Sequence, residues 1–375
     1  MTSDDQPKRT KKDLQLLQAL PLYLKIPMTV RRLRDWIDYY GEDGVYLSWS
    51  GGKDSTVLRH IIRQYWPNVV SVFANTGLEY PEIQRFVKAA KDRGEPVEIL
   101  RPEMRFDEVI KRYGYPIISK EVSEKVRKAR NNVRDGKYSL RLCQLGVDPS
   151  EYGGLEVDER YDYFGAVKWS KYDVKKYRPM LDVDFLVSEE CCQVMKKDVF
   201  SQYEAITGKV PILGMLAAES QKRLQGWLKT GCNAFDSDRP QSNPIAFWTN
   251  QDVLEYIKTY DVEIPSVYGS VVYASEPEQI RIEEITGQSV GCDRLCTTGC
   301  NRTGCIFCGF GAHAGCDGAD RFIELKRTHP NQYAYCIGGG AYNEDGIWQP
   351  SKEGLGMGHV FDTLNRIYGD GFIKY

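Results

Sequence analysis

Apolar residues recur with two different periods along residues 45–100. Short apolar runs at 45–49, 69–73 and 97–100 predict strands, and the stretches 54–66 and 81–93 carry apolar residues on one helical face. Strands that alternate with helices of this length are typical of βαβ units and a parallel sheet. We therefore expect an α/β fold with a parallel sheet and helices on both faces.

The same reading extends to the rest of the chain. A helix is predicted over residues 30–40, and a later strand over 211–216 precedes a helix over 218–228. Residues 101–190 are charged, tyrosine-rich and mostly helical in pattern, and after residue 230 short helices at 249–260 and 319–329 alternate with Gly- and Cys-rich loops. We expect an N-terminal tail and helix over 1–43, a domain over 44–230 with a helical insertion at about 101–190, and a small Cys-rich C-terminal lobe over 231–375.

Charge and hydropathy argue against a membrane protein, a secreted protein and a chain-wide nucleic-acid-binding surface. The 375 residues include 50 basic and 52 acidic side chains, so nothing indicates a chain-wide polyanion surface. No apolar run approaches the ~20 residues that span a bilayer, and the N-terminus lacks the apolar core of a secretory signal. We expect a cytoplasmic protein without membrane partners, in which the 11 cysteines serve as metal ligands or in catalysis rather than as disulfides.

A glycine-rich loop follows the first predicted strand and opens the first helix. Gly51 and Gly52 let the backbone approach an anion, and the helix N-terminus behind them attracts phosphate. The spacing differs from the Walker loop. A tight turn with an incidental lysine is the alternative to a phosphate-binding loop. The candidate phosphate ligands are Ser50, Gly51, Gly52, Lys53, Asp54, Ser55 and Thr56.

This loop, Ser-Gly-Gly-Lys-Asp-Ser, resembles the SGGxDS loop of the PP-loop ATP pyrophosphatases, which have the adenine nucleotide alpha hydrolase-like fold. The resemblance implies that the loop holds the pyrophosphate end of ATP and that Asp54 helps to bind Mg²⁺. We expect catalytic roles for Lys53 and Asp54, because Lys53 and Mg²⁺ would stabilise the charge on a leaving pyrophosphate. The sequence as a whole resembles the DNA-phosphorothioation proteins and the uncharacterised phosphoadenosine phosphosulfate (PAPS) reductase-like proteins.

Two further segments resemble PAPS reductases. Residues 75–82 are similar to a loop that lies against adenosine in that family, which implies nucleotide contacts for Thr76 and Gly77, although Asn75 replaces an aspartate. The second segment is the start of the predicted helix after residue 217. Its resemblance implies that Ser220 and Arg223 line the nucleotide site, with Arg223 as a third catalytic residue. Ordinary strand–helix turns and a solvated arginine are the structural alternatives.

The cysteines suggest a metal centre. Cys191-Cys192 and the distant Cys305-x-x-Cys308 resemble the four-cysteine pattern of cluster-bearing adenylylsulfate reductases, which implies one [4Fe–4S] cluster on these thiolates. A zinc site formed by Cys296, Cys300 and the Cys-x-x-Cys pair, and no metal at all, are the alternatives.

These features favour an enzyme. Sulfonucleotide reductases have altered phosphate loops and a cysteine nucleophile near the C-terminus, whereas this loop is intact and the last cysteine is Cys336. The leading hypothesis is therefore cleavage of ATP to AMP and pyrophosphate, which activates an acceptor for Fe–S-assisted transfer of sulfur from a donor. One alternative is PAPS or adenylylsulfate (APS) reduction with a thioredoxin-like reductant, in which Cys336 or another thiol attacks sulfur.

The other alternative is a module that senses nucleotides or binds nucleic acid without turnover. A basic stretch motivates it, for which a solvated helix face is the simpler explanation. Its cations are Lys120, Lys125, Arg127, Lys128 and Arg130.

Overall fold

The computed structural model describes residues 9–148, 151, 156–157, 174–274, 294–314 and 320–375. The chain forms two compact units built from interleaved segments. The first unit comprises Met1–Asn75, Glu79–Arg101 and Val199–Gly304, and the second comprises Thr76–Leu78, Pro102–Asp198 and Cys305–Tyr375. The small Cys-rich lobe expected over 231–375 is not confirmed, because its residues are divided between the units. The expected boundaries at residues 43 and 230 stay a prediction.

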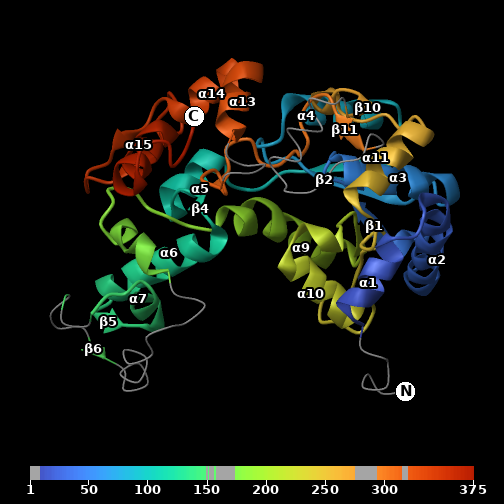
Figure 1. The fold of residues 1–375 in the computed structure, drawn as a ribbon, viewed down its shortest axis with the longest axis horizontal. Coiled ribbons are helices and arrows are strands. Elements are labelled where there is room, and N and C mark those ends of the chain that lie inside the picture. The colour runs from blue at the N-terminus through green and yellow to red at the C-terminus, as the bar shows by residue number, and fades with distance from the viewer. Residues whose placement is uncertain (1–8, 149–150, 152–155, 158–173, 275–293, 315–319) are drawn as a thin grey trace. The chain divides into compact units, whose positions relative to one another are not determined.

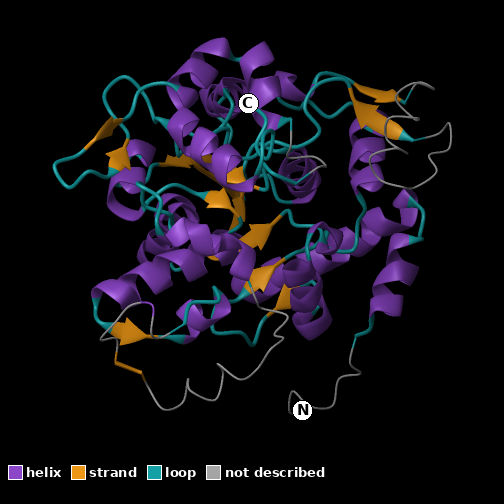
Figure 2. Ribbon diagram, turned by 60° about the vertical axis from the view of Figure 1, so that its left-hand side comes forward, coloured by secondary structure: helices purple, strands orange, loops and turns teal. Residues whose placement is uncertain are grey.

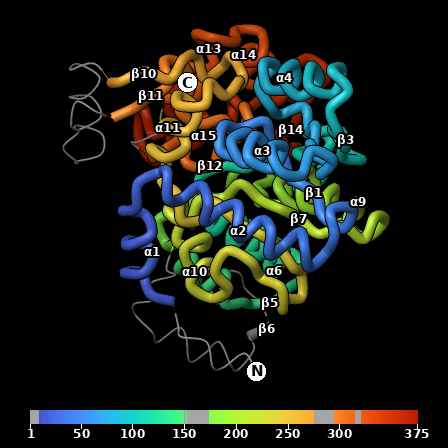
Figure 3. The backbone as a smooth tube through the Cα atoms, turned by 90° about the vertical axis from the view of Figure 1, so that its right-hand side faces the viewer, coloured from blue at the N-terminus to red at the C-terminus, as the bar shows by residue number. Residues whose placement is uncertain are grey.

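A six-stranded sheet forms the centre of the first unit, in the order β3-β2-β1-β7-β9-β8. All neighbouring strands pair in parallel except β8 and β9, which are antiparallel. Strands β1 and β7 lie side by side, with Leu47 opposite Ile212 (Figure 3). The predicted parallel sheet is confirmed. Its strands are β1 (Val45–Ser48), β2 (Val70–Ala74), β3 (Val97–Leu100), β7 (Val210–Leu213), β8 (Asn233–Ala234) and β9 (Gln241–Ser242).

Helices cover both faces of this sheet, as predicted. On one face, Tyr46 of β1 and Val72 of β2 pack against Tyr203 of α9 (Asp198–Thr207). Successive side chains of a strand point to opposite faces, so the neighbouring Ser71 lies on the other face. There its hydroxyl accepts a 3.0 Å hydrogen bond from Arg59 Nε of α3 (Lys53–Tyr65).

The N-terminal segment differs from the prediction. The sequence predicts a tail before a helix over 30–40, but α1 (Lys11–Gln18) forms within that tail and α2 runs over Leu22–Tyr40 (Figure 1). A capping box between Thr10 and Asp13 starts α1. Pro27 lies early in α2, where proline usually signals a break. Packing overrides that signal, because Lys25 is buried and bonded to Asp252.

The remaining helices of the first unit lie close to their predicted positions, whereas its short strands over Val271–Tyr273 and Leu295–Thr297 were not predicted. Thr249 caps the helix Asn250–Thr259, since its hydroxyl accepts a hydrogen bond from the Asp252 amide at 3.2 Å. These elements are α4 (Pro81–Asp92), α10 (Gln221–Thr230), α11 (Asn250–Thr259), β10 (Val271–Tyr273), β11 (Leu295–Thr297) and three 3-10 turns over Glu42–Gly44, Ala217–Glu219 and Ser266–Tyr268.

Helices form most of the regular structure of the chain (Figure 2), and the described part of the predicted insertion at 101–190 is largely helical. In the second unit, β4 (Ile117–Ile118) pairs in parallel with β12 (Gly309–Phe310). Its other strands are β5 (Lys137–Tyr138), β6 (Glu156–Val157), β13 (Ala341–Tyr342) and β14 (Trp348–Gln349). Its helices are α5 (Phe106–Tyr113), α6 (Lys120–Arg134), α7 (Leu140–Gln144), α13 (Arg321–Thr328), α14 (Pro330–Ile337), α15 (Met357–Tyr368), a 3-10 helix over Lys175–Leu181 and a π-helical turn over Gln193–Lys197. Among the helices in the described ranges, none is both long and apolar enough to cross a bilayer.

Candidate functional site

The glycine loop lies where an open parallel sheet usually places its ligand, between the end of β1 and the start of α3. Gly51 has φ +70°, and a Cβ atom there would lie 2.5 Å from Ile83 Cγ2. Only glycine therefore fits this position without strain. The Ser50 hydroxyl lies 3.0 Å from the Ser55 hydroxyl and accepts a hydrogen bond from the Gly52 amide at 3.3 Å. These contacts hold the loop in a compact turn at the N-terminus of α3.

A second close approach holds the start of α3 against the neighbouring strand. Gly214 directly follows β7, and a Cβ atom there would lie 2.8 Å from Ser55 Cα. A side chain at this position would push the helix away from β7. On the other flank of the loop, Trp49 Nε1 donates a 3.0 Å hydrogen bond to the Thr56 hydroxyl. The loop is thus fixed from both sides by elements of the central sheet.

The two charged residues of the loop lie together at the first turn of α3. Lys53 is buried, its Nζ donates a hydrogen bond to the Asn301 carbonyl at 3.3 Å, and it lies 3.8 Å from the Asp54 carboxylate. The other oxygen of Asp54, Oδ1, is buried and has no hydrogen-bond partner among the described residues. A buried carboxylate oxygen without a partner is costly. It suits a divalent cation, which prefers oxygen ligands.

Arg223 lies near the same carboxylate. Burial and the charge of Arg302 lower the pKa of Arg223, and Asp54 acts in the opposite direction. Both arginines pair with Glu219, which lies 3.1 Å from Arg302. Ser220 caps α10, since its hydroxyl accepts a 3.3 Å hydrogen bond from the Arg223 amide. Two guanidinium groups next to the loop can bind an oxyanion by paired hydrogen bonds.

Sequence reasoning missed Tyr268. Its buried hydroxyl accepts a hydrogen bond from the Lys53 amide at 3.2 Å and lies 2.6 Å from the Thr303 hydroxyl. Burial raises the pKa of Tyr268 to about 12, so the phenol stays protonated. The partners are 215 positions apart, and no local pattern signals such a contact.

The second predicted nucleotide element follows β2 in the chain. Thr76 is buried, and its hydroxyl accepts a 3.2 Å hydrogen bond from the Leu78 amide. Gly77 has φ +76°, with open space where a Cβ atom would stand. Thr76 and Gly77 fall in the second unit, so their predicted contacts with adenosine stay a prediction.

The four cysteines predicted to bind a cluster all belong to the second unit, and none forms a disulfide. Cys191 and Cys192 are hydrogen-bonded to each other, and this bond, burial and the nearby charges of Cys192, Cys308 and Cys305 raise the pKa of Cys191. The same bond and the charges of Lys120 and Lys196 lower the pKa of Cys192, although burial opposes them. The cysteine pair and the Cys-x-x-Cys turn therefore lie close enough to interact.

Four thiolates would carry a negative charge that Lys120 and Lys196 would offset, and a cluster on these cysteines stays a prediction. The Arg321 guanidinium also lies nearby and donates a 2.6 Å hydrogen bond to the Cys308 carbonyl. Among the described side chains, no group of three or more potential ligands is arranged at metal-binding geometry. Of the other cysteines near the C-terminus, Cys292 and Cys316 lie outside the described residues.

Intramolecular partners engage most cations of the basic helix α6. Lys125 pairs with Glu121, Lys128 with Glu124, and Arg127 with both Glu189 and Glu190. Arg130 donates hydrogen bonds to three backbone carbonyls, those of Leu181, Val183 and Phe185. These pairs favour a structural role for the helix, and a nucleic-acid partner stays a prediction.

No curated protein matches the chain. A solved structure described as phosphoadenylyl-sulfate (PAPS) reductase from Candida auris in a phosphate complex is similar at 14% identity and a TM-score of 0.35, covering 72% of this chain and 95% of that one. A family model described as the phosphoadenosine phosphosulfate reductase domain matches residues 44–138 and 156–309. Because this match spans well over half of the chain, including the glycine loop, the chain belongs to the phosphoadenosine phosphosulfate reductase domain family.

Proposed function

We propose that this member of the family is an ATP pyrophosphatase that adenylates an acceptor and prepares it for sulfur transfer. An oxygen of the acceptor attacks the α-phosphorus of ATP, the bond to the β-phosphate breaks, and pyrophosphate leaves. A sulfur nucleophile then displaces AMP from the activated acceptor. The chain's own residues bind the triphosphate and stabilise the charge that develops on the leaving pyrophosphate.

The unpartnered Oδ1 of Asp54 carries this proposal. It lies at the N-terminus of α3, next to Lys53 and near Arg223, within a complete Ser-Gly-Gly-Lys-Asp-Ser loop. A Mg²⁺ ion bound with a triphosphate would satisfy this oxygen and would neutralise phosphate charge. The backbone amides of the loop and the helix N-terminus would bind the remaining charge.

The cysteine cluster supports the sulfur-transfer half of the proposal. Cys191, Cys192, Cys305 and Cys308 would hold a [4Fe–4S] cluster, which supplies a site for sulfur ligation or for electron transfer when bound. Lys120 and Lys196 would balance its charge. Zinc on the same thiolates is the alternative metal.

One observation disfavours the reductase alternative in the form that uses Cys336. This thiol is fully buried on α14, where it lies 3.5 Å from Met357 Sδ, and burial raises its pKa. A sulfur nucleophile acts as the exposed thiolate. Cys336 therefore suits the core of the second unit better than attack on a sulfonucleotide.

The test is to incubate the anaerobically purified protein with Mg²⁺ and either ATP with a candidate acceptor or PAPS with thioredoxin. Pyrophosphate release from ATP is expected, and sulfite release from PAPS with thioredoxin but no turnover of ATP would overturn the proposal. Asp54→Asn should lower pyrophosphate release by about a hundredfold or more, because it removes the proposed Mg²⁺ contact. Asp92→Asn, an exposed aspartate on α4, is the matched control and should leave release unchanged.

A further inference from the structure

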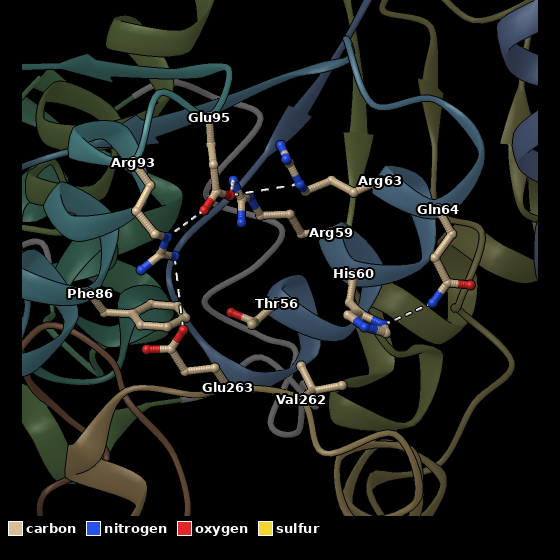
Figure 4. Close-up of a pocket in the computed structure, with 10 residues that line it drawn as sticks. All are labelled: Thr56, Arg59, His60, Arg63, Gln64, Phe86, Arg93, Glu95, Val262 and Glu263. Atoms are coloured by element: carbon tan, nitrogen blue, oxygen red, sulfur yellow. Dashed lines mark hydrogen bonds and ion pairs between the residues drawn. The ribbon is translucent and has the colours of Figure 1, made fainter.

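A pocket lies on the first unit along α3, and of its lining residues only Thr56 belongs to the glycine loop. Its cavity volume is about 310 Å³, and side chains from α3, from the end of α4 and from residues 262–263 line it (Figure 4). Arg59, Arg63 and Arg93 all contribute to its wall, and Phe86 and Val262 add an apolar side. Three guanidinium groups around one small cavity are unusual, because like charges repel.

The carboxylate of Glu95 lies next to all three arginines. Glu95 accepts hydrogen bonds from Arg59 at 2.6 Å and from Arg93 at 2.8 Å, and Arg63 Nε lies 3.7 Å away. Burial raises the pKa of Glu95, but the hydrogen bonds from Arg93 and Arg59 outweigh burial and lower this pKa, so the Glu95 carboxylate stays ionised. The other acidic lining residue, Glu263, is 70% exposed and 3.9 Å from Arg93. The pocket therefore keeps an excess of positive charge.

Arg63 is the group with unused bonding capacity. Its Nη1 is buried and has no hydrogen-bond partner among the described residues, although the side chain as a whole is 31% exposed. A guanidinium nitrogen buried in this way costs free energy unless an acceptor reaches it. The Nδ1 atom of neighbouring His60 shares a 3.0 Å hydrogen bond with the Tyr256 hydroxyl. Burial lowers the pKa of His60. His60 therefore adds no second charge near neutral pH.

Arg59 is held in place and does not compete for a ligand. Its guanidinium stacks 4.2 Å above the Trp49 ring, and its Nε donates to Ser71. Arg63 and Arg93 remain as the adaptable groups, and Figure 4 shows Arg93 beside Phe86 and Arg63 on the other side of Arg59. Glu95 precedes β3, so the pocket reaches the amino end of that strand, whereas the glycine loop follows the carboxyl end of β1.

From this arrangement we infer a second anion site: the pocket binds a small oxyanion of the phosphate or sulfate class through Arg63 and Arg93. The oxyanion accepts hydrogen bonds from the guanidinium groups of Arg63 and Arg93, in the paired geometry that such groups offer. Glu95 stays bonded to Arg59 and offsets the repulsion between the guanidinium groups. The apolar side formed by Phe86 and Val262 limits the ligand to a small head group.

The test is calorimetric titration of the full chain with inorganic phosphate, and separately with sulfate, at constant ionic strength. Arg63→Gln should weaken binding by about tenfold or more, since a hydrogen bond to a charged group is lost. Arg93→Gln should weaken it in the same direction, which guards against misfolding of a single variant. Arg85→Gln is the matched control, because Arg85 on α4 is 72% exposed and pairs only at the surface with Glu82. It should stay within about twofold of the unmodified protein.

A third variant separates this pocket from the glycine loop. Lys53→Ala alters the loop and leaves the pocket intact, so the binding that depends on Arg63 should persist in it. The proposal is overturned if neither anion binds, if Arg63→Gln binds as well as the unmodified protein, or if Lys53→Ala removes all binding. The fate of ATP cleavage in any variant does not bear on this result.

Discussion

The hydroxyl of Tyr268 accepts a hydrogen bond from the backbone amide of Lys53 at 3.2 Å. This contact fastens the short 3-10 turn at Ser266–Tyr268 to the first turn of α3, where the candidate phosphate site lies. The phenol also lies 2.6 Å from the Thr303 hydroxyl, so it connects the glycine loop with the segment at the end of the first unit. One buried side chain thereby orders two distant segments around the loop.

Tyr268→Phe should destabilise the protein by about 1–3 kcal/mol, because it leaves a buried amide and the Thr303 hydroxyl without their shared partner. Urea unfolding monitored by circular dichroism measures this difference. Tyr23→Phe is the control, since the ring of Tyr23 is 71% exposed and its change should have almost no effect. Equal stability of the two variants would show that the Tyr268 hydroxyl does not hold the loop.

Gly51→Ala should disrupt the loop more than the same change at another glycine with positive φ. Gly51 and Gly94 have φ of +70° and +79°, so alanine costs backbone strain of about 1 kcal/mol at either position. At Gly51 the new methyl also lies 2.5 Å from Ile83 Cγ2, whereas at Gly94 it meets open space. We expect Gly51→Ala to cost about 1–3 kcal/mol more in the free energy of unfolding. Equal losses would mean that Ile83 moves away freely.

Lys25→Met tests the buried ion pair that fixes α2 on α11. Lys25 Nζ lies 2.6 Å from Asp252, and their side chains are only 1% and 9% exposed. Removing the lysine leaves a buried carboxylate unpaired, which should cost about 3–5 kcal/mol in the free energy of unfolding. The double variant Lys25→Met with Asp252→Asn should recover part of this loss. A single variant as stable as the unmodified protein would contradict the prediction.

Much of the fold could be predicted from the sequence, because burial imposes a period on each element. The predicted strand at 97–100 matches β3, and the predicted helix at 81–93 ends one residue beyond α4. The early start of α2 could not be predicted, since Pro27 normally marks a break and only tertiary packing offsets its cost. The two compact units also could not be predicted, because they interleave segments far apart in the chain.

The candidate site also has one part that the sequence predicts and one part that it does not. Gly51 and its neighbours could be recognised from the sequence, since a glycine loop between a strand and a helix is a local pattern. The support from Tyr268, Asn301 and Glu219 could not, because each contact is made by residues distant in sequence. Local patterns therefore predict where a ligand binds, and long-range contacts decide how rigidly the loop is held.

Acid should weaken the second unit through Asp184. Burial raises the pKa of Asp184, but hydrogen bonds from Tyr342 at 2.7 Å and His359 at 2.8 Å outweigh burial. The pKa of Asp184 therefore lies below its ordinary value of 3.8. A lowered folded-state pKa gives stability that is present above pH 3.8 and is lost as the pH falls through the folded value. Asp184→Asn should be less stable at neutral pH and lose less stability on acidification.

Guanidinium unfolding at a series of pH values checks this expectation. Asp370→Asn, an exposed aspartate after α15, is the control and should keep the acid dependence of the unmodified protein. If Asp184→Asn loses stability below pH 4 as steeply as the control does, the carboxylate of Asp184 does not contribute to acid sensitivity.

Anaerobic purification should yield about four irons and as much acid-labile sulfide per chain, if the four cysteines hold a [4Fe–4S] cluster. Cys192→Ala and Cys308→Ala should each lose most of this iron, because each removes one thiolate from the set that interacts through Cys191. Cys232→Ala is the matched control. Cys232 is also buried but lies in the first unit, so its loss should leave the iron content unchanged. Zinc without iron, or an iron content unchanged in both Cys192→Ala and Cys308→Ala, would contradict the cluster, because thiolates are the ligands that hold it.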